Sequence, residues 1–148
     1  MRPRTDFASA SLRHLVDAQI LFDANRWANS YYLAGYVLEC GRKALCFAGF
    51  EEGHGRFSKK IGHRFDDVSD QVIDLIGLFS PYAARYNGPA KDWQTKFPSL
   101  SGWDPNRRYE SATSVNRADA VNLLADARKA FDYSVGRLWA DGVAEAAF

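Results

Sequence analysis

The stretch that decides the fold is residues 29–48, NSYYLAGYVLECGRKALCFA. Its small and apolar residues recur at spacings of three and four, the repeat of one face of an α-helix. That stripe consists of Ala34, Val37, Leu38, Gly41, Ala44, Leu45 and Ala48. The opposite side carries Tyr32 and Tyr36, so we expect it to be covered too, by the rest of the fold or by a second subunit. The stretch therefore predicts a central helix over residues 26–49 of a helical bundle.

Three charged residues, Glu39, Arg42 and Lys43, interrupt this helix near its middle. A charge beside a core is costly unless another group pairs with it. In the predicted last helix, Arg128 falls in the middle of an apolar stripe, so a buried Arg128 would need a partner such as Glu39. We favour this pair, with a structural role first and a ligand contact second. The alternative is a solvated pair at a spacing of four within one helix.

The rest of the chain also has helical periodicity, and no strand pattern competes with it. Further helices are predicted over residues 6–24, 65–79 and 116–141, with Asn116 capping the last of them. Residues 50–64 are predicted to be a loop, and residues 80–115 a long irregular connection rich in proline and aromatic residues. The predicted class is all-α: one domain, residues 1–148, forming an antiparallel up-and-down bundle of four to five helices with an aromatic-rich loop before the last helix.

The composition of the chain limits the classes of protein and of binding site that we expect. The chain has 148 residues, of which 47% are hydrophobic, and this predicts a folded globular domain. A net charge of +1 gives no bulk attraction to nucleic acid or membrane. Cys40 and Cys46 fall on different faces of one helix and are expected to be buried thiols of a reducing cytoplasm. The three histidines are scattered, so no metal site is expected. Neither a signal peptide nor a membrane-spanning stretch is expected.

Residues 31–44, YYLAGYVLECGRKA, resemble the second helix of HEPN domains, helical bundles named for nucleotide binding in higher eukaryotes and prokaryotes. Other features follow in the order that the family shows, and the resemblance covers about residues 8–140. They are Gly62-His63 before the third helix, a tryptophan in the long loop, then Trp103-Asp104-Pro105 and Arg108-Tyr109, and a long amphipathic last helix.

This resemblance implies a cytoplasmic bacterial protein that often forms a homodimer through its helices. It also implies a partner, since many such proteins are encoded beside a minimal nucleotidyltransferase in toxin–antitoxin or defence systems. Active members are metal-independent ribonucleases whose last long helix carries an arginine followed, four to six residues on, by a histidine. Here Tyr133 follows Arg128 at that distance, and a tyrosine hydroxyl is a poor proton shuttle at neutral pH. The resemblance therefore implies a module that binds a nucleotide, RNA or a partner protein without a cofactor and without the full catalytic motif.

Two alternatives stay open. One is a metal-independent ribonuclease with a degenerate site, either Arg128 with Tyr133 or Arg56 with His63, in which the histidine would be the base. His63 is otherwise a residue at a helix start whose ring hydrogen-bonds nearby backbone. The other alternative is a purely structural helical dimer that scaffolds another subunit.

The loop before the last helix mixes cations with aromatic rings. Such surfaces suit single-stranded nucleic acid, because bases stack on the rings while the cations meet phosphates. The candidate ligand-binding residues there are Trp103, Arg107, Arg108 and Tyr109. The interpretation that we favour is a loop pinned over the core by Trp93 and Trp103.

Overall fold

A computed structural model describes residues 3–53, 84–104 and 114–144 of the chain. These ranges are mostly helical and contain no strand, which confirms the all-α class for this part of the chain. The long helices are α1 (Pro3–Asp23), α2 (Trp27–Gly53) and α6 (Arg117–Phe131). Shorter elements are α4 (Ala84–Asn87), α5 (Trp93–Lys96), the 3₁₀ helix η2 (Pro98–Gly102), the π-helical turn η5 (Asp132–Gly136) and α7 (Arg137–Ala140). None of the described helices has the length and apolar character needed to cross a membrane.

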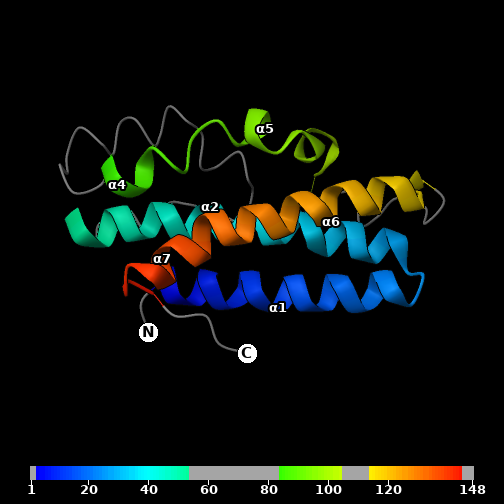
Figure 1. Cartoon of the computed structure of the whole chain (residues 1–148), viewed down its shortest axis with the longest axis horizontal. Helices are drawn as coiled ribbons and strands as arrows, with labels where there is room; N and C mark the ends of the chain where they lie inside the picture. The colour runs from blue at the N-terminus through cyan, green and yellow to red at the C-terminus, as the bar shows by residue number, and fades with distance from the viewer. Residues whose placement is uncertain (1–2, 54–83, 105–113, 145–148) are drawn as a thin grey trace.

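The three long helices lie side by side (Figure 1). The segment that holds α4 and α5 runs along α2 and α6. Residues 24–26 join α1 to α2, with Asn25 in the left-handed conformation at φ 62°, which asparagine tolerates better than most residues. The predicted helix over 65–79 lies outside the described residues. The predicted end of the central helix at residue 49 is too early, because α2 continues to Gly53.

Helix α2 is the inner column, as its sequence predicts. Every residue of the predicted stripe is buried, and so is the whole run from Val37 to Ala48. Small residues let the neighbouring helices approach closely. A Cβ added at Gly41 would lie 2.4 Å from Oγ of Ser134. The Ser11 hydroxyl donates to the Val37 carbonyl at 2.9 Å, and the Ser30 hydroxyl donates to the Ala18 carbonyl at 2.7 Å. Each of these buried hydroxyls therefore has a hydrogen-bond partner across the contact between α1 and α2.

The last predicted helix is divided into α6, η5 and α7. Its start is as predicted: the Asn116 side chain accepts from the Asp119 backbone N–H at 2.9 Å, and the Asp119 carboxylate accepts from the Asn116 N–H at 3.2 Å. This reciprocal arrangement is a capping box, which satisfies two backbone donors at the helix start. The sequence predicts an apolar stripe along this helix, with Arg128 in its middle, that consists of Val121, Leu124, Phe131, Val135, Leu138 and Trp139. Leu124, Val135 and Leu138 are buried, but Arg128 is exposed and Trp139 is 69% exposed. The face of α6 that packs inward consists of Ala120, Leu123, Leu124, Ala127 and Ala130.

Aromatic residues hold the described part of the long connection against the helices. Trp93, Phe97, Leu100 and Trp103 are all buried. The Trp103 indole N–H donates to the Tyr32 carbonyl at 3.1 Å, and a Cβ added at Gly35 would lie 1.9 Å from the indole ring. Trp103 therefore occupies the space that a side chain at Gly35 would fill. This contact holds the end of η2 against α2.

Candidate functional site

The charged residues in the middle of α2 form a buried cluster. The Lys43 ammonium lies 2.9 Å from the Glu39 carboxylate, and both side chains are nearly inaccessible to solvent. The prediction that Arg128 meets Glu39 is wrong, because Arg128 is exposed and the partner that the structure gives Glu39 is Lys43, one helical turn further on. Arg42 is also buried, and its Nε donates to the Ala90 carbonyl at 2.7 Å. These contacts are structural, and ligand binding by the three residues stays a prediction.

Trp103 belongs to an aromatic cluster nearer the start of α2, on the helix face that also carries Glu39 and Lys43. Its ring centroid lies 5.0 Å from that of Tyr36 and 6.4 Å from that of Tyr32. The Tyr32 hydroxyl donates to the Tyr36 hydroxyl at 2.9 Å, and the His14 ring lies 5.6 Å from Tyr36. Burial, then the neighbouring charge of Arg13, lowers the pKa of His14, so its ring is neutral at pH 7. Since Trp103 is only 8% exposed, little of its ring is open to a stacking base.

The predicted residues Arg56, His63, Arg107, Arg108 and Tyr109 lie outside the described residues. The pairing of Arg56 with His63 and the nucleic-acid contacts of the other three stay predictions. Of the predicted catalytic residues, the structure describes Arg128 and Tyr133. Arg128 lies exposed on α6, and Tyr133 lies half-buried in the π-helical turn η5. Wide turns of this kind are rare and frequently occur at functional sites.

Two cations surround Tyr133. The Lys96 ammonium, from α5, donates to the Tyr133 hydroxyl at 3.0 Å and lies 5.0 Å from the ring centroid. The Arg137 guanidinium, one turn further along the helix, lies 4.9 Å from the same centroid, and its Nε donates to the Tyr133 carbonyl at 3.3 Å. Both distances are in the range of cation–π contacts. We call Lys96, Tyr133 and Arg137 the Tyr133 cluster.

Buried rings support the Tyr133 cluster from beneath. The centroids of Trp93 and Phe97 lie 6.4 Å and 6.2 Å from that of Tyr133, in edge-to-face arrangements. Trp93 is 1% exposed and its indole N–H donates to the Pro89 carbonyl at 2.8 Å, so α5 is fixed in place. The sequence offered a signal for Arg137, because residues four positions apart in a helix, such as Tyr133 and Arg137, lie on the same face. It offered none for Lys96, which is 37 residues away along the chain.

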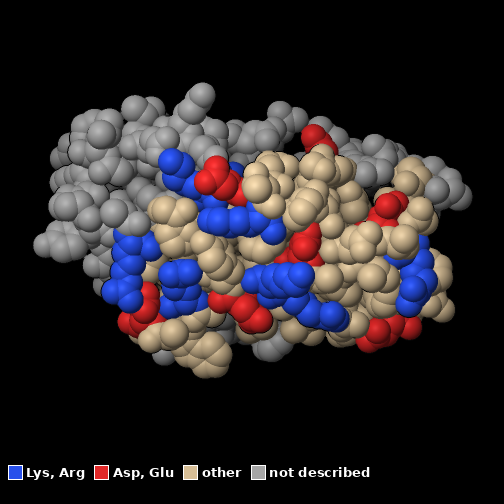
Figure 2. All heavy atoms as spheres, turned by 45° about the horizontal axis from the view of Figure 1, so that its top comes forward, with Lys and Arg blue, Asp and Glu red and all other residues tan. Residues whose placement is uncertain are grey.

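The described surface carries charges of both signs. Figure 2 shows lysines and arginines interspersed with aspartates and glutamates across one face of the molecule. Since the net charge of the chain is only +1, attraction for an anion depends on a few cations placed close together. The Tyr133 cluster is such a place. Lys129, which is exposed one turn before Tyr133, adds a further cation beside it.

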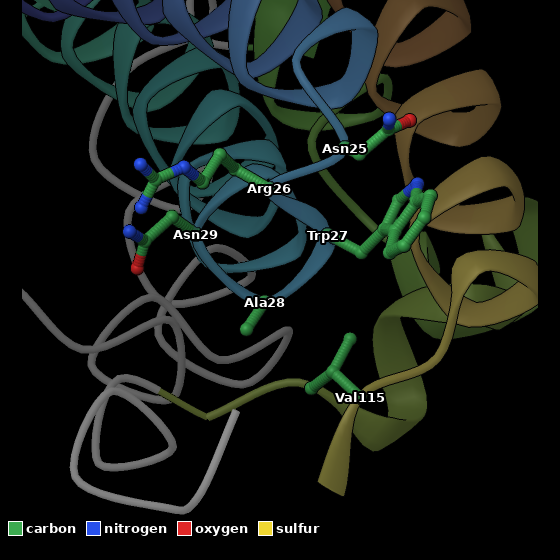
Figure 3. Close-up of a pocket in the computed structure, with 6 residues that line it drawn as sticks. All are labelled: Asn25, Arg26, Trp27, Ala28, Asn29 and Val115. Carbon is green, nitrogen blue, oxygen red and sulfur yellow. The ribbon is translucent and has the colours of Figure 1, made fainter. Parts of the chain in front are cut away.

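Two hollows lie elsewhere on the described surface. One, of about 280 Å³, opens at the start of α2 (Figure 3) and is lined by Asn25, Arg26, Trp27, Ala28, Asn29 and Val115. The Trp27 indole N–H there is buried without a hydrogen-bond partner. Because that nitrogen is closed to solvent, it is not available to a molecule entering the hollow. The other hollow, of about 260 Å³, is lined by Tyr31, Ser99, Ser101, Gly102, Asp119 and Asn122.

The described residues do not offer a metal or thiolate site. They contain no group of three histidine, cysteine or acidic side chains that could hold a metal ion. Cys40 and Cys46 are buried thiols. Burial, together with the charge of Glu39, raises the pKa of the Cys40 thiol to about 12, so Cys40 is a protonated and unreactive thiol at neutral pH.

Comparison of the chain with models of protein families, with curated proteins and with solved structures finds no match.

Proposed function

We propose that this chain is a HEPN-like helical module that binds RNA or a nucleotide at the Tyr133 cluster and does not cleave it. The proposal includes a complete four- to five-helix bundle, in which the described α1, α2 and α6 are three of the helices. It takes from the sequence resemblance a cytoplasmic location, a homodimer and a nucleotidyltransferase-like partner in a toxin–antitoxin or defence system. The buried, tightly packed column of α2 supports the resemblance, because residues 31–44 carry it.

The observation that carries the binding proposal is the contact of Lys96 with the Tyr133 hydroxyl at 3.0 Å, with Arg137 over the same ring. Two cations that converge on one phenol are suited to a negatively charged ligand. Phosphates dominate the affinity of proteins for nucleic acids, and each cation that meets a phosphate contributes through release of counterions. The location of Tyr133 in a π-helical turn supports a functional rather than a structural role.

The same contact argues against cleavage. A ribonuclease needs a base that takes a proton from the 2′-hydroxyl and a donor for the leaving oxygen. The Lys96 ammonium can only donate, so it occupies a lone pair of the Tyr133 oxygen that a base would need to accept the proton of a 2′-hydroxyl. The rival proposal, a ribonuclease that uses Arg128 with Tyr133, is favoured by one observation: Arg128 is exposed and therefore accessible to a substrate.

Fluorescence anisotropy with labelled single-stranded RNA tests the binding proposal. The double variant Lys96→Ala with Arg137→Ala removes both cations of the Tyr133 cluster. The matched control, Arg13→Ala with Arg117→Ala, removes two exposed cations elsewhere and changes the net charge equally. We expect the first variant to lose most of its RNA affinity at low salt, while the control loses little. Equal losses in the two variants would show that binding does not occur at the Tyr133 cluster.

Cleavage is assayed separately by incubating the purified protein with RNA in the presence of a chelator. We expect intact RNA. Cutting that persists with chelator and disappears in Arg128→Ala would establish the ribonuclease instead. The native mass of the purified protein tests the proposed homodimer.

A further inference from the structure

The Tyr133 cluster has an unusual set of hydrogen-bond donors. The Lys96 ammonium has three N–H groups, and its described contacts use two of them, on the Tyr133 hydroxyl and on the Lys91 carbonyl, each at 3.0 Å. Because the Tyr133 oxygen accepts from Lys96, its own O–H remains as a donor, and no described residue accepts from it. Arg137 uses Nε on the Tyr133 carbonyl, and its two terminal nitrogens make no described hydrogen bond.

The geometry points to a site for a phosphate oxyanion, held by the Lys96 ammonium, the Tyr133 hydroxyl and the Arg137 guanidinium. This inference rests on the proposed function and names the chemical group that the site recognises. All three groups donate, and two carry positive charge. Charge-assisted bonds to phosphate oxygens are among the stronger hydrogen bonds in proteins, and arginine is particularly suited to the planar edge that two phosphate oxygens present.

A base or a sugar is not recognised at this site. The Tyr133 ring is already packed by two cations and by the edges of Trp93 and Phe97, so a nucleobase would have to displace one of them to stack on it. Trp93 and Phe97 are themselves 1% and 5% exposed and offer no stacking platform. Two cations and a hydroxyl donor match the negative charge of phosphate oxygens, which base edges and the 2′-hydroxyl do not carry. We therefore expect the site to bind the phosphates of RNA, DNA and pyrophosphate alike.

The experiment uses the full chain and three probes: a short oligouridine, the corresponding oligothymidine and inorganic pyrophosphate. Tyr133→Phe removes the donor hydroxyl and keeps the ring. Its matched control, Tyr86→Phe, removes a hydroxyl that donates to Asp141 at 3.1 Å and is not part of the Tyr133 cluster. We expect Tyr133→Phe to weaken all three probes about tenfold, the effect of one hydrogen bond to a charged group, and Tyr86→Phe to leave them unchanged. Lys96→Gln should also lower the slope of log affinity against log salt by about 0.7 for either oligonucleotide.

The outcomes separate this inference from the proposed function. Equal affinity for the two oligonucleotides, with parallel losses in Tyr133→Phe and Lys96→Gln, supports both. If RNA binds but neither variant weakens it, or if RNA binds more than tenfold tighter than DNA, the oxyanion site is refuted while RNA binding stands. If pyrophosphate binds and depends on Tyr133, but neither oligonucleotide binds, the oxyanion site stands and RNA binding is refuted. If no probe binds, both are refuted.

Discussion

Replacing Gly35 by alanine perturbs the contact that fixes the end of the 84–104 segment on α2. An alanine Cβ would lie 1.9 to 2.2 Å from three atoms of the Trp103 indole, which is far inside van der Waals contact. Both partners have little freedom to yield, because Gly35 is part of a helix and the indole is hydrogen-bonded to the Tyr32 carbonyl. We therefore expect the alanine to drive Trp103 out of its site.

The magnitude follows from what Trp103 loses. A tryptophan side chain buries about 200 Å² of surface, and at about 25 cal/mol per Å² complete expulsion would cost about 5 kcal/mol. Loss of the indole hydrogen bond raises this cost by about 1 kcal/mol, and the better helix propensity of alanine lowers it by about 1 kcal/mol. Since a displaced ring keeps part of its burial, we expect Gly35→Ala to lower the free energy of unfolding by about 2 to 4 kcal/mol.

The decisive measurement is a double-mutant cycle by urea denaturation, followed by circular dichroism. In a Trp103→Ala background the clash no longer exists, so Gly35→Ala should raise the free energy of unfolding by about 0.5 to 1 kcal/mol through helix propensity. The sign of the effect should therefore reverse between the two backgrounds. As a control, Gly136→Ala places its Cβ no closer than 3.8 Å to a neighbouring atom and should not destabilise the protein. Destabilisation by Gly35→Ala that is unchanged in the Trp103→Ala background would refute the proposed contact.

Three further predictions concern stability. Glu39→Gln leaves the Lys43 ammonium buried without its carboxylate and should cost about 3 to 5 kcal/mol in urea denaturation; adding Lys43→Met should recover part of that loss, and a failure to recover any would argue against the pair. Asn116→Ala breaks the capping box and should cost about 1 kcal/mol, whereas Asn122→Ala, at an exposed position within α6, should cost nothing. The raised pKa of Cys40 stabilises the folded protein fully below the ordinary thiol value of 9.0, and this contribution is lost as the pH rises toward about 12. The free energy of unfolding should thus fall more steeply over this range in the wild type than in Cys40→Ala, and equal slopes would contradict the assignment.

Local patterns predicted the parts of the fold that depend on local chemistry. The stripe of α2 was predictable because small and apolar residues repeat at the helical period from Ala34 to Ala48. The cap at Asn116 was predictable because the capping side chain bonds a backbone group only three residues away. Neither feature requires knowledge of what the helix packs against.

The inward face of α6 was predicted only in part, because pattern reading favours large apolar residues. Leu124 belongs to both faces. At about 100° per residue, the observed face is rotated by roughly 80° from the predicted one, toward Ala120, Ala127 and Ala130. Alanines allow α6 to approach α2 more closely than larger side chains would, and that choice depends on the partner helix. The rotation carries Arg128 out to solvent. It also removes the reason to pair Arg128 with Glu39.

The Tyr133 cluster could not be predicted from local patterns, because its residues meet only through the packing of the connection onto the helices. Arg42 of α2 holds the Ala90 carbonyl, and the buried Trp93 then fixes α5. This places Lys96 where its ammonium bridges the Lys91 carbonyl and the Tyr133 hydroxyl. No spacing along the chain encodes a contact that depends on three successive packing events. The buried charge of Arg42, which looked like a possible ligand contact in the sequence, instead helps to position the cation that meets Tyr133.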